Sequence, residues 1–392
     1  LLAFMDLTGA YLDQSITHNR RVDGLFHSYN LVEFRDEGYT VENLPEMLEG
    51  QVAVLSSGYL GASESLELLD ALESSRIYRS DQNSYVLYPY RKLQPFAEKN
   101  FIPAALVQDS EWMKSQLASG RGEFVEQDVN GSVHFNGGFR NAQELRVALE
   151  QEPEIAPGEI DTLCQAFEDL FQHRQFTGRS GAMYKYEGLG CIYWHMVSKL
   201  LLATSEVIAA ACMGPVEQEV LNGLLGHFDR VQAGIGVHKT PDQYGAIPLD
   251  PYSHTTGFSG VQQPGMTGQV KEDIITRFAE LGVEVENGEV RFSPVMLKKS
   301  EFVSEPVTWI YASGNSERSL ELAAGTLAFM LCGVPVTYRL ADTAGIQVDA
   351  GDAGVISITD NNLGEEWSAS LFRRENRISC LLVDVPQEAL RD

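Results

Sequence analysis

Basic residues are scarce in this 392-residue chain, in which 29 lysines and arginines stand against 55 aspartates and glutamates and give a formal net charge of −26. A surface of this charge repels phosphate backbones and anionic lipid headgroups. We therefore expect no nucleic acid and no membrane among the partners. The same acidity is an ordinary means of keeping a protein soluble, so it excludes partners without identifying one.

Cysteine is also scarce, and the five cysteines are widely spaced, with no CxxC pair: Cys164, Cys191, Cys212, Cys332 and Cys380. Neither a disulfide framework nor a zinc cluster is indicated by this spacing. We expect buried free thiols and no metal.

Long apolar runs are missing as well. The richest stretch, residues 200–213, is interrupted by Thr204, Ser205 and Glu206. A membrane-spanning helix needs about 20 consecutive apolar residues, so this stretch is too short and too polar. We expect no transmembrane helix.

Three strong catalytic signatures are absent: the GxxxxGK[ST] phosphate loop, the HExxH zinc helix and the GxSxG nucleophile elbow. The glycine-containing fragments at 188–191 and 234–238 lack the third glycine and the strand-to-helix context of a dinucleotide site. We expect no cofactor.

The length and the texture of the chain predict an α+β protein of two domains. A chain of 392 residues exceeds what one hydrophobic core usually organises, and its 44% hydrophobic and 21% charged residues are ordinary for a packed protein. Helical patterns fill residues 1–282, and short strands fill residues 283–392. We place the boundary near Gly282 and Val283 and expect a packed junction there.

Helix signals dominate the first part of the chain. We expect one helix capped by Asn43, one capped by Ser63, one that follows Pro215 and one that follows Thr267 and stops at Gly282. Their apolar residues recur at three- and four-residue steps, which is typical of amphipathic helices. Between them, residues 123–138 alternate around Asn130-Gly131 and predict a small β-hairpin.

The last part of the chain has strand texture. VEVENGEVRF carries a second Asn-Gly turn, and the segments that follow are TWIYA, TLAFMLCGVPVTYRL, GVISIT and SASLFRRENRISCLLVDV. Short β-rich segments between turn signals indicate an antiparallel sandwich or sheet.

The opening segment, LLAFMDLTGAYLDQS, starts directly in a helical pattern without an initiating Met or a signal peptide. We expect the chain to be an excerpt of a longer polypeptide, with its helical domain incomplete at the N-terminus.

The first candidate site segment is TGRSGAMYKYEGLGCIYWHMVSKLLLA, residues 177–203. Glu187, Trp194 and His195 recur at helical steps and share one face. A carboxyl beside aromatic rings has a raised pKa, as a general acid needs, so Glu187 is a candidate acid. Tyr184, Trp194 and His195 are candidate substrate contacts. The alternative is a capping glutamate with a packed histidine and tryptophan.

The second candidate segment is the loop of residues 238–270, which is dense in polar and aromatic side chains. Loops of this length in a compact domain are usually functional or disordered. Asp250, Tyr252 and His254 could act on a substrate, whereas a turn-capping role between two neighbours is the alternative for Asp250. The amide and amine side chains that suit hydrogen bonding to hydroxyl groups are Lys239, Gln263 and Gln269. Glu272 follows on the polar side of its helix, and we expect it to be solvated.

Helices joined by long polar loops and followed by a β part resemble the (α/α)-toroid, six-hairpin carbohydrate-active enzymes, in particular the glycoside phosphorylases and hydrolases of the cellobiose-phosphorylase type. The segment GRSGAMYKYEGLG, residues 178–190, is similar to the Gly-Arg-x-Gly loop of those phosphorylases, which contributes to their phosphate site. The resemblance implies a toroid-like helical domain and makes Arg179 and Ser180 anion-site candidates. The Asp-Trp-Asn motif that carries the general acid in those enzymes has no counterpart here.

These observations support a carbohydrate-active enzyme portion, a glycoside hydrolase or glycoside phosphorylase that acts on a neutral glucan or oligosaccharide. Glu187 would be the general acid and Asp250 the base or water-positioning group; inversion needs their carboxyls about 6.5–9.5 Å apart and retention about 5–5.5 Å. The expected partners are an oligosaccharide or polysaccharide and inorganic phosphate. The alternatives are a non-catalytic glycan-binding or scaffold part and, third, a polysaccharide lyase. The sugar, the oligomeric state and the compartment stay open.

Overall fold

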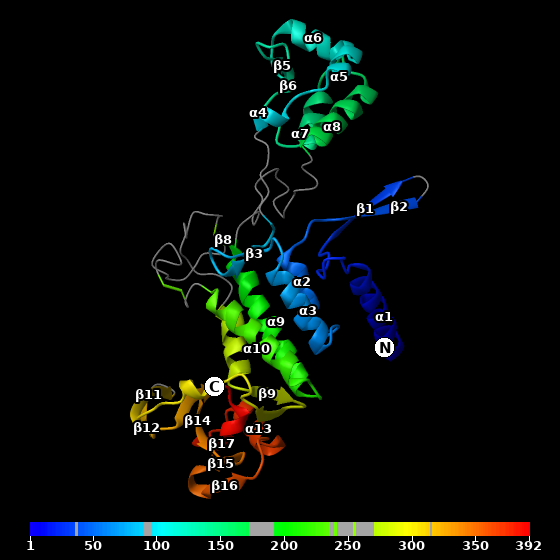
Figure 1. Ribbon diagram of the computed structural model, residues 1–392. Helices are drawn as coiled ribbons and strands as arrows, with labels where there is room; N and C mark the ends of the chain where they lie inside the picture. Colours follow the sequence, from blue (N-terminus) through cyan, green and yellow to red (C-terminus); the bar gives the residue numbers. More distant parts are fainter. Residues whose placement is uncertain are drawn as a thin grey trace. The chain divides into compact units, whose positions relative to one another are not determined.

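The computed structural model describes residues 1–35, 38–89, 96–171, 192–235, 239–240, 254–255, 270–313 and 316–392. Within these ranges the chain is an α+β protein with a β-rich C-terminal region, as the sequence predicts (Figure 1). Glu187, Asp250 and most of the other predicted site residues lie outside the described residues.

Contacts divide the chain into two compact units. Unit 1 comprises Leu1–Gln51, Leu72–Tyr193 and Thr240–Gly265, and unit 2 comprises Val52–Ala71, Trp194–Lys239 and Met266–Asp392. Each unit is built from segments distant in the sequence. The predicted boundary near residue 282 falls inside unit 2 and stays a prediction.

Unit 1 combines short helices with two-stranded sheets. Its hairpins pair β1 with β2, β3 with β4, and β5 with β6, and β7 pairs with the distant strand β8, all antiparallel. The helices are α1 (Leu2–His18), α4 (Phe96–Lys99), α5 (Ala104–Asp109), α6 (Glu111–Ser119), α7 (Ala142–Leu149) and α8 (Pro157–Phe171), and α2 (Leu48–Ser56) and α3 (Ala62–Glu73) start in one unit and end in the other. The strands are β1 (Asn30–Arg35), β2 (Gly38–Asn43), β3 (Tyr78–Arg79), β4 (Ser84–Tyr85), β5 (Val125–Gln127), β6 (Val133–Phe135), β7 (Ile192–Tyr193) and β8 (His254–Thr255).

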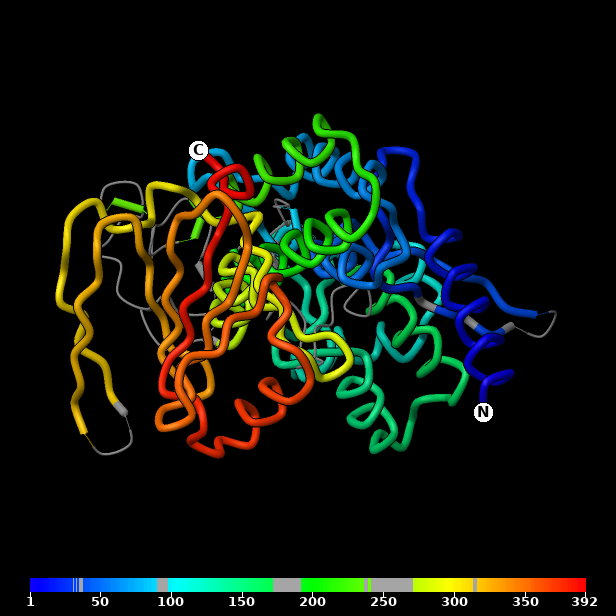
Figure 2. The backbone as a smooth tube through the Cα atoms, turned by 90° about the horizontal axis from the view of Figure 1, so that it is seen from below, coloured from blue at the N-terminus to red at the C-terminus, as the bar shows by residue number. Residues whose placement is uncertain are grey.

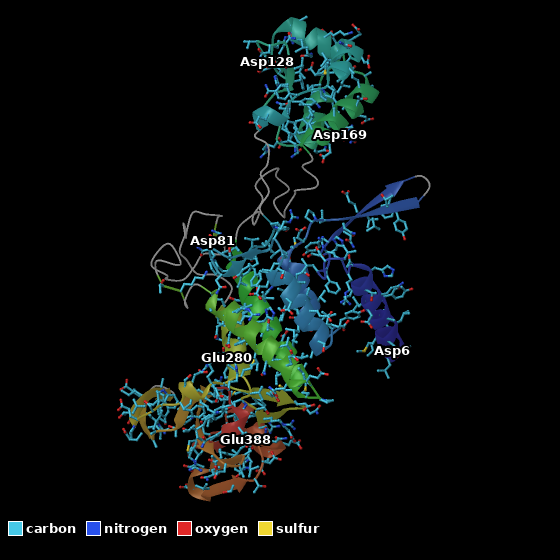
Figure 3. All side chains as sticks on the ribbon, in the orientation of Figure 1. Asp6, Asp81, Asp128, Asp169, Glu280 and Glu388 are labelled. Carbon is cyan, nitrogen blue, oxygen red and sulfur yellow. The ribbon has the colours of Figure 1, made fainter. Side chains whose placement is uncertain are left out.

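The segment from α4 to α8 has a hydrophobic core of its own. Pro157 opens α8, where its missing N–H costs no hydrogen bond, and the buried residues of this helix follow at three- and four-residue steps. Phe167 packs edge-on against Phe135 and tilted against Phe171, with ring centroids 5.2 and 4.5 Å apart. Among the described residues, the cluster of buried residues to which these rings belong runs from Ile102 to Phe171. Figure 3 marks Asp128 and Asp169 on this segment.

Unit 2 contains the longest described helix, α9 (Trp194–Cys212), which packs against α10 (Gln218–Ala233) and α12 (Val270–Glu280). α10 buries Leu224, Phe228 and Val231 along one stripe, as its spacing predicts. α9 is the one described helix that is long and apolar enough to cross a membrane by length and composition. More than half of it is buried against protein, so the expected absence of a membrane span stays a prediction that this packing favours.

The C-terminal region of unit 2 is a five-stranded sheet in the order β13-β14-β17-β15-β16, preceded by two hairpins. Figure 2 shows it from another side, in orange to red. Tyr338 is buried on β14, and its hydroxyl donates a hydrogen bond of 2.6 Å to the carbonyl oxygen of Leu281, which ties the sheet to the end of α12. The strands are β9 (Val283–Glu286), β10 (Glu289–Phe292), β11 (Val307–Ser313), β12 (Ser316–Leu322), β13 (Thr326–Leu331), β14 (Val334–Ala341), β15 (Gly345–Asp349), β16 (Val355–Ile358) and β17 (Cys380–Pro386). This region has one α-helix among the described residues, α13 (Glu365–Arg373), and the short 3-10 helices η3 (Lys299–Glu301), η4 (Gly351–Ala353) and η5 (Gln387–Ala389).

Two expectations about this β region are wrong. The sheet is not wholly antiparallel, because β17 pairs with β14 in parallel and with β15 antiparallel. The segment SASLFRR is not a strand, because its first six residues belong to α13 and Arg374 is the C-cap of that helix. α13 carries the chain back so that β17 can enter the middle of the sheet. Strand order depends on which distant segments pair, and local alternation does not encode it.

Several local predictions are confirmed and others need correction. The hairpin at 123–138 is β5–β6, and the second Asn-Gly turn joins β9 to β10. Asn43 does not cap a helix, since it ends β2 and α2 begins only at Leu48. Among the described cysteines, all free, Cys164 is buried as expected, but Cys212 is exposed because it ends α9.

Candidate functional site

The described part of the predicted working surface centres on a histidine–carboxylate pair. His195, in the first turn of α9, donates a hydrogen bond of 2.9 Å from Nε2 to Oε1 of Glu272, in the first turn of α12. Lys271 lies 3.4 Å from the same oxygen. The two helices bring together residues that are 77 positions apart in the sequence.

Glu272 was expected to be solvated, and that expectation is wrong. Its exposed fraction is 3%, because the side of α12 that carries it packs against α9. The same face of α12 continues at four-residue steps with Thr276 and Glu280, both buried. The sequence signal was present as a polar stripe on α12, but a stripe of this kind usually faces water.

Burial opposes ionisation of Glu272, yet the hydrogen bond from His195 and the charges of His195 and Lys271 outweigh it and lower the pKa of the carboxyl below its ordinary value. Glu272 is therefore an anion that fixes the orientation of the His195 ring.

Trp194 and Lys239 form a second contact at the same end of α9. The ammonium nitrogen of Lys239 lies 5.0 Å from the centre of the Trp194 ring, within the range of a cation–π interaction. Both side chains are buried. The structure thus gathers five polar or aromatic groups from three segments of unit 2, and three of the five, Trp194, His195 and Lys239, were predicted as substrate contacts.

Three buried oxygens in this helix pair have no hydrogen-bond partner among the described residues. They are Ser198 Oγ on α9, and Glu272 Oε2 and Thr276 Oγ1 on α12. Buried polar atoms are rarely left without a partner in folded proteins. Three oxygens between α9 and α12 could therefore each accept a further hydrogen bond.

A cavity of about 460 Å³ lies beside this polar stripe, also within unit 2. It is mostly lined by charged and polar side chains, with Leu201, Phe228, Ile235 and Met296 as its apolar lining. α12 contributes Asp273, Thr276, Arg277 and Glu280. Figure 3 marks Glu280 on this helix.

Most of the charges around this cavity are paired with one another. Asp229 on α10 accepts hydrogen bonds from Arg391 and forms an ion pair of 3.1 Å with Lys298. Burial disfavours the Asp229 anion, but these two cations outweigh it and lower the pKa of the carboxyl. Arg277 binds Glu280 and Glu301 at 2.6 and 2.7 Å. The network joins α10 and α12 to the C-terminal segment.

Strands from the two predicted site segments, residues 177–203 and 238–270, pair with each other in unit 1. β7 and β8 pair antiparallel, with Ile192 opposite Thr255 and Tyr193 opposite His254. This pairing places the backbone of the second predicted segment beside the residues that lead into α9.

The other predicted site residues lie outside the described residues, so their geometry stays a prediction: Arg179, Ser180, Tyr184, Glu187, Asp250, Tyr252, Gln263 and Gln269. Of His254 the structure describes only the backbone. Among the residues with described side chains, no group of three or more His, Cys, Asp or Glu residues is placed to hold a metal ion.

Comparison with known proteins identifies the class first. Residues 93–174 match a protein-family model of a domain from glycoside phosphorylases, which are carbohydrate-active enzymes. The matched family is GH149 phosphorylase insertion domain 2, and the matched range contains the independent core of α4 to α8. The chain is therefore related to glycoside phosphorylases through this insertion. Comparison with curated proteins gives no match.

Proposed function

We propose that the chain is part of a glycoside phosphorylase that cleaves a neutral glucan or oligosaccharide with inorganic phosphate. The match of residues 93–174 to a phosphorylase insertion domain is the observation that carries this proposal. The helices joined by long polar loops, from which a toroid-like domain is predicted, and the resemblance of residues 178–190 to a phosphate-site loop support it. The formal charge of −26 favours a neutral polymer over an anionic one.

Phosphorolysis needs one acid from the protein. The acid gives its proton to the glycosidic oxygen as that bond breaks, and a phosphate oxygen forms the new bond to the anomeric carbon, which yields a sugar 1-phosphate and a shortened glucan. We assign the acid to Glu187. A carboxylate base is required only when water is the nucleophile. Replacement of Asp250 should therefore abolish hydrolysis but leave phosphorolysis in place.

His195, Lys239, Arg179 and Ser180 are the proposed groups for substrate and phosphate. Glu272 is a positioning residue in this scheme, because it touches His195 and holds the imidazole in one orientation. A cationic group matters here because the protein as a whole repels phosphate.

The test is product analysis of the full-length protein on a panel of α- and β-glucans, with and without inorganic phosphate. We expect sugar 1-phosphate to form only when phosphate is present. Glu187→Gln should reduce the rate by about 10²-fold or more, which is the usual contribution of a general acid. The control is Glu305→Gln, an exposed residue of unit 2, which should leave the rate unchanged.

Asp250→Asn completes the experiment. A variant that retains phosphorolysis supports the proposal, because Asp250 is then not needed when phosphate attacks. Release of free sugar at a rate independent of phosphate contradicts the proposal and favours a hydrolase.

A glycan-binding or scaffold part is the second candidate, because the matched region is an insertion rather than a catalytic segment. This candidate predicts that sugar binding is unchanged in Glu187→Gln and that the protein converts no glucan of the panel, with or without phosphate.

A further inference from the structure

A second cavity, of about 510 Å³, lies in the C-terminal β region of unit 2. Three parts of the fold line it: the β11–β12 hairpin, the turn between β13 and β14, and the loop from α13 to β17. Its lining residues include three arginines, Arg318, Arg374 and Arg377, and no aspartate or glutamate. A lining of this composition is unusual in a chain with a net charge of −26.

Two of the three guanidinium groups are available to a ligand. Arg377 pairs with Glu366 at 2.7 Å and lies over the ring of Trp367, 5.1 Å from its centre. The side chains of Arg318 and Arg374 form no ion pair within the described part of the chain, and both are exposed.

A buried hydroxyl adds an independent signal. Ser370 lines the cavity from the last turns of α13, and its exposed fraction is 3%. Its Oγ has no hydrogen-bond partner among the described residues. A buried hydroxyl without a partner costs free energy unless a ligand or water supplies one.

Tyr311 brings an aromatic ring to the cavity next to one of the arginines. It stands directly opposite Arg318 in the register of β11 and β12, and its ring stacks on that of Trp309, with centroids 4.8 Å apart. Asn376 and Ser379 complete the polar lining with groups that can bond to hydroxyls.

We propose that this cavity binds a sugar phosphate. Guanidinium groups recognise phosphate through paired, charge-assisted hydrogen bonds, and Arg318 and Arg374 supply them. The cavity is much larger than an inorganic phosphate ion, and the hydroxyl, amide and aromatic groups of its lining suit a sugar ring. This inference rests on the lining alone and holds whether or not the chain is a phosphorylase.

The test is calorimetric titration of the full chain with glucose 1-phosphate, glucose 6-phosphate, inorganic phosphate and glucose. We expect a binding event for the sugar phosphates that is weaker for inorganic phosphate and absent for glucose. The double variant Arg318→Gln/Arg374→Gln should raise the Kd of this event by about tenfold or more, because two charged hydrogen-bond donors are lost. Ser370→Ala should raise it by a smaller factor.

The matched control is Arg121→Gln/Arg291→Gln, which removes the same charge from exposed positions outside the cavity. It should leave the Kd unchanged, and circular dichroism of each variant confirms that it is folded. Equal Kd values for the wild type and the Arg318→Gln/Arg374→Gln variant overturn the inference, as does the absence of any binding of sugar phosphate.

The outcome is separable from the proposed function. If glucans are not converted but the arginine-dependent event is present, the phosphorylase proposal fails and this site stands. If glucans are converted and the only sugar-phosphate event is insensitive to Arg318 and Arg374, this site fails and the phosphorylase proposal stands.

Discussion

At the scale of the residue, the carboxylate of Glu272 holds together the N-terminal turns of α9 and α12. Glu272 is buried and His195 is partly buried, so solvent screens their bond less than it would screen a pair on the surface. Ionised groups that are buried persist only when they are paired and hydrogen-bonded, and here one oxygen is paired while the other has no partner among the described residues.

Replacement of Glu272 by glutamine should lower the free energy of unfolding by about 2–3 kcal/mol, because a charge-assisted hydrogen bond becomes a neutral one in a buried site. Denaturant titration measures this change. Glu305→Gln, at an exposed position, is the control and should change stability by less than about 0.5 kcal/mol. Equal values for the two variants would show that the pair contributes nothing.

The loss of stability in Glu272→Gln should depend on pH. The pKa of Glu272 in the folded protein lies below its ordinary value of 4.5. Its contribution is therefore fully present above that value and is lost as the pH falls through the folded pKa. The difference in stability between wild type and Glu272→Gln should shrink as the pH is lowered from about 6 to about 3, and a constant difference would contradict this assignment.

At the scale of the element, Gly282 controls how α12 passes into β9. Its φ of +67° is in the left-handed region, and a Cβ at this position would lie 2.1 Å from the carbonyl carbon of Ser293. The amide of Ser293 donates a hydrogen bond of 2.7 Å to the Gly282 carbonyl oxygen, so the two backbones are in direct contact. Only glycine allows this approach.

Gly282→Ala should therefore lower the free energy of unfolding by more than about 4 kcal/mol, through left-handed strain and displacement of the backbone at Ser293. The matched control is Gly288→Ala in the β9–β10 turn, where φ is +85° but nothing lies within 4 Å of the new Cβ. That variant should lose only about 1 kcal/mol. Thermal unfolding followed by circular dichroism compares the two, and similar losses would refute the steric argument.

At the scale of the whole molecule, residues 93–174 form a segment with a hydrophobic core of its own. The match to an insertion domain and the core cluster confined to Ile102–Phe171 agree in range. A segment of this size can bury enough apolar surface to fold by itself.

Produced alone, the segment 93–174 should unfold in one cooperative transition. Phe167→Ala should lower its stability by about 3–5 kcal/mol, since the side chain is fully buried between two other rings. Val129→Ala, at a fully exposed position, is the control and should change little. A broad, non-cooperative transition for the wild-type segment would show that it depends on the rest of the chain.

The sequence by itself determined the α+β class, the presence of the helices α10 and α12, and the hairpins β5–β6 and β9–β10. These features depend on periodicity and turn chemistry within a few residues. For α12 the pattern gave the helix but not its buried face, because Ile274 is exposed and Glu272 is buried. It also singled out His195, Trp194 and Lys239, which the structure brings together.

Only the tertiary structure decided the rest. The burial of Glu272, the parallel entry of β17 beside β14 and the arginine-lined cavity depend on segments that are distant in the chain. The extent of the core between Ile102 and Phe171 was likewise decided by which residues pack with one another. Pairing between distant segments is set by packing over the whole unit, and the pattern of any one segment leaves it undetermined.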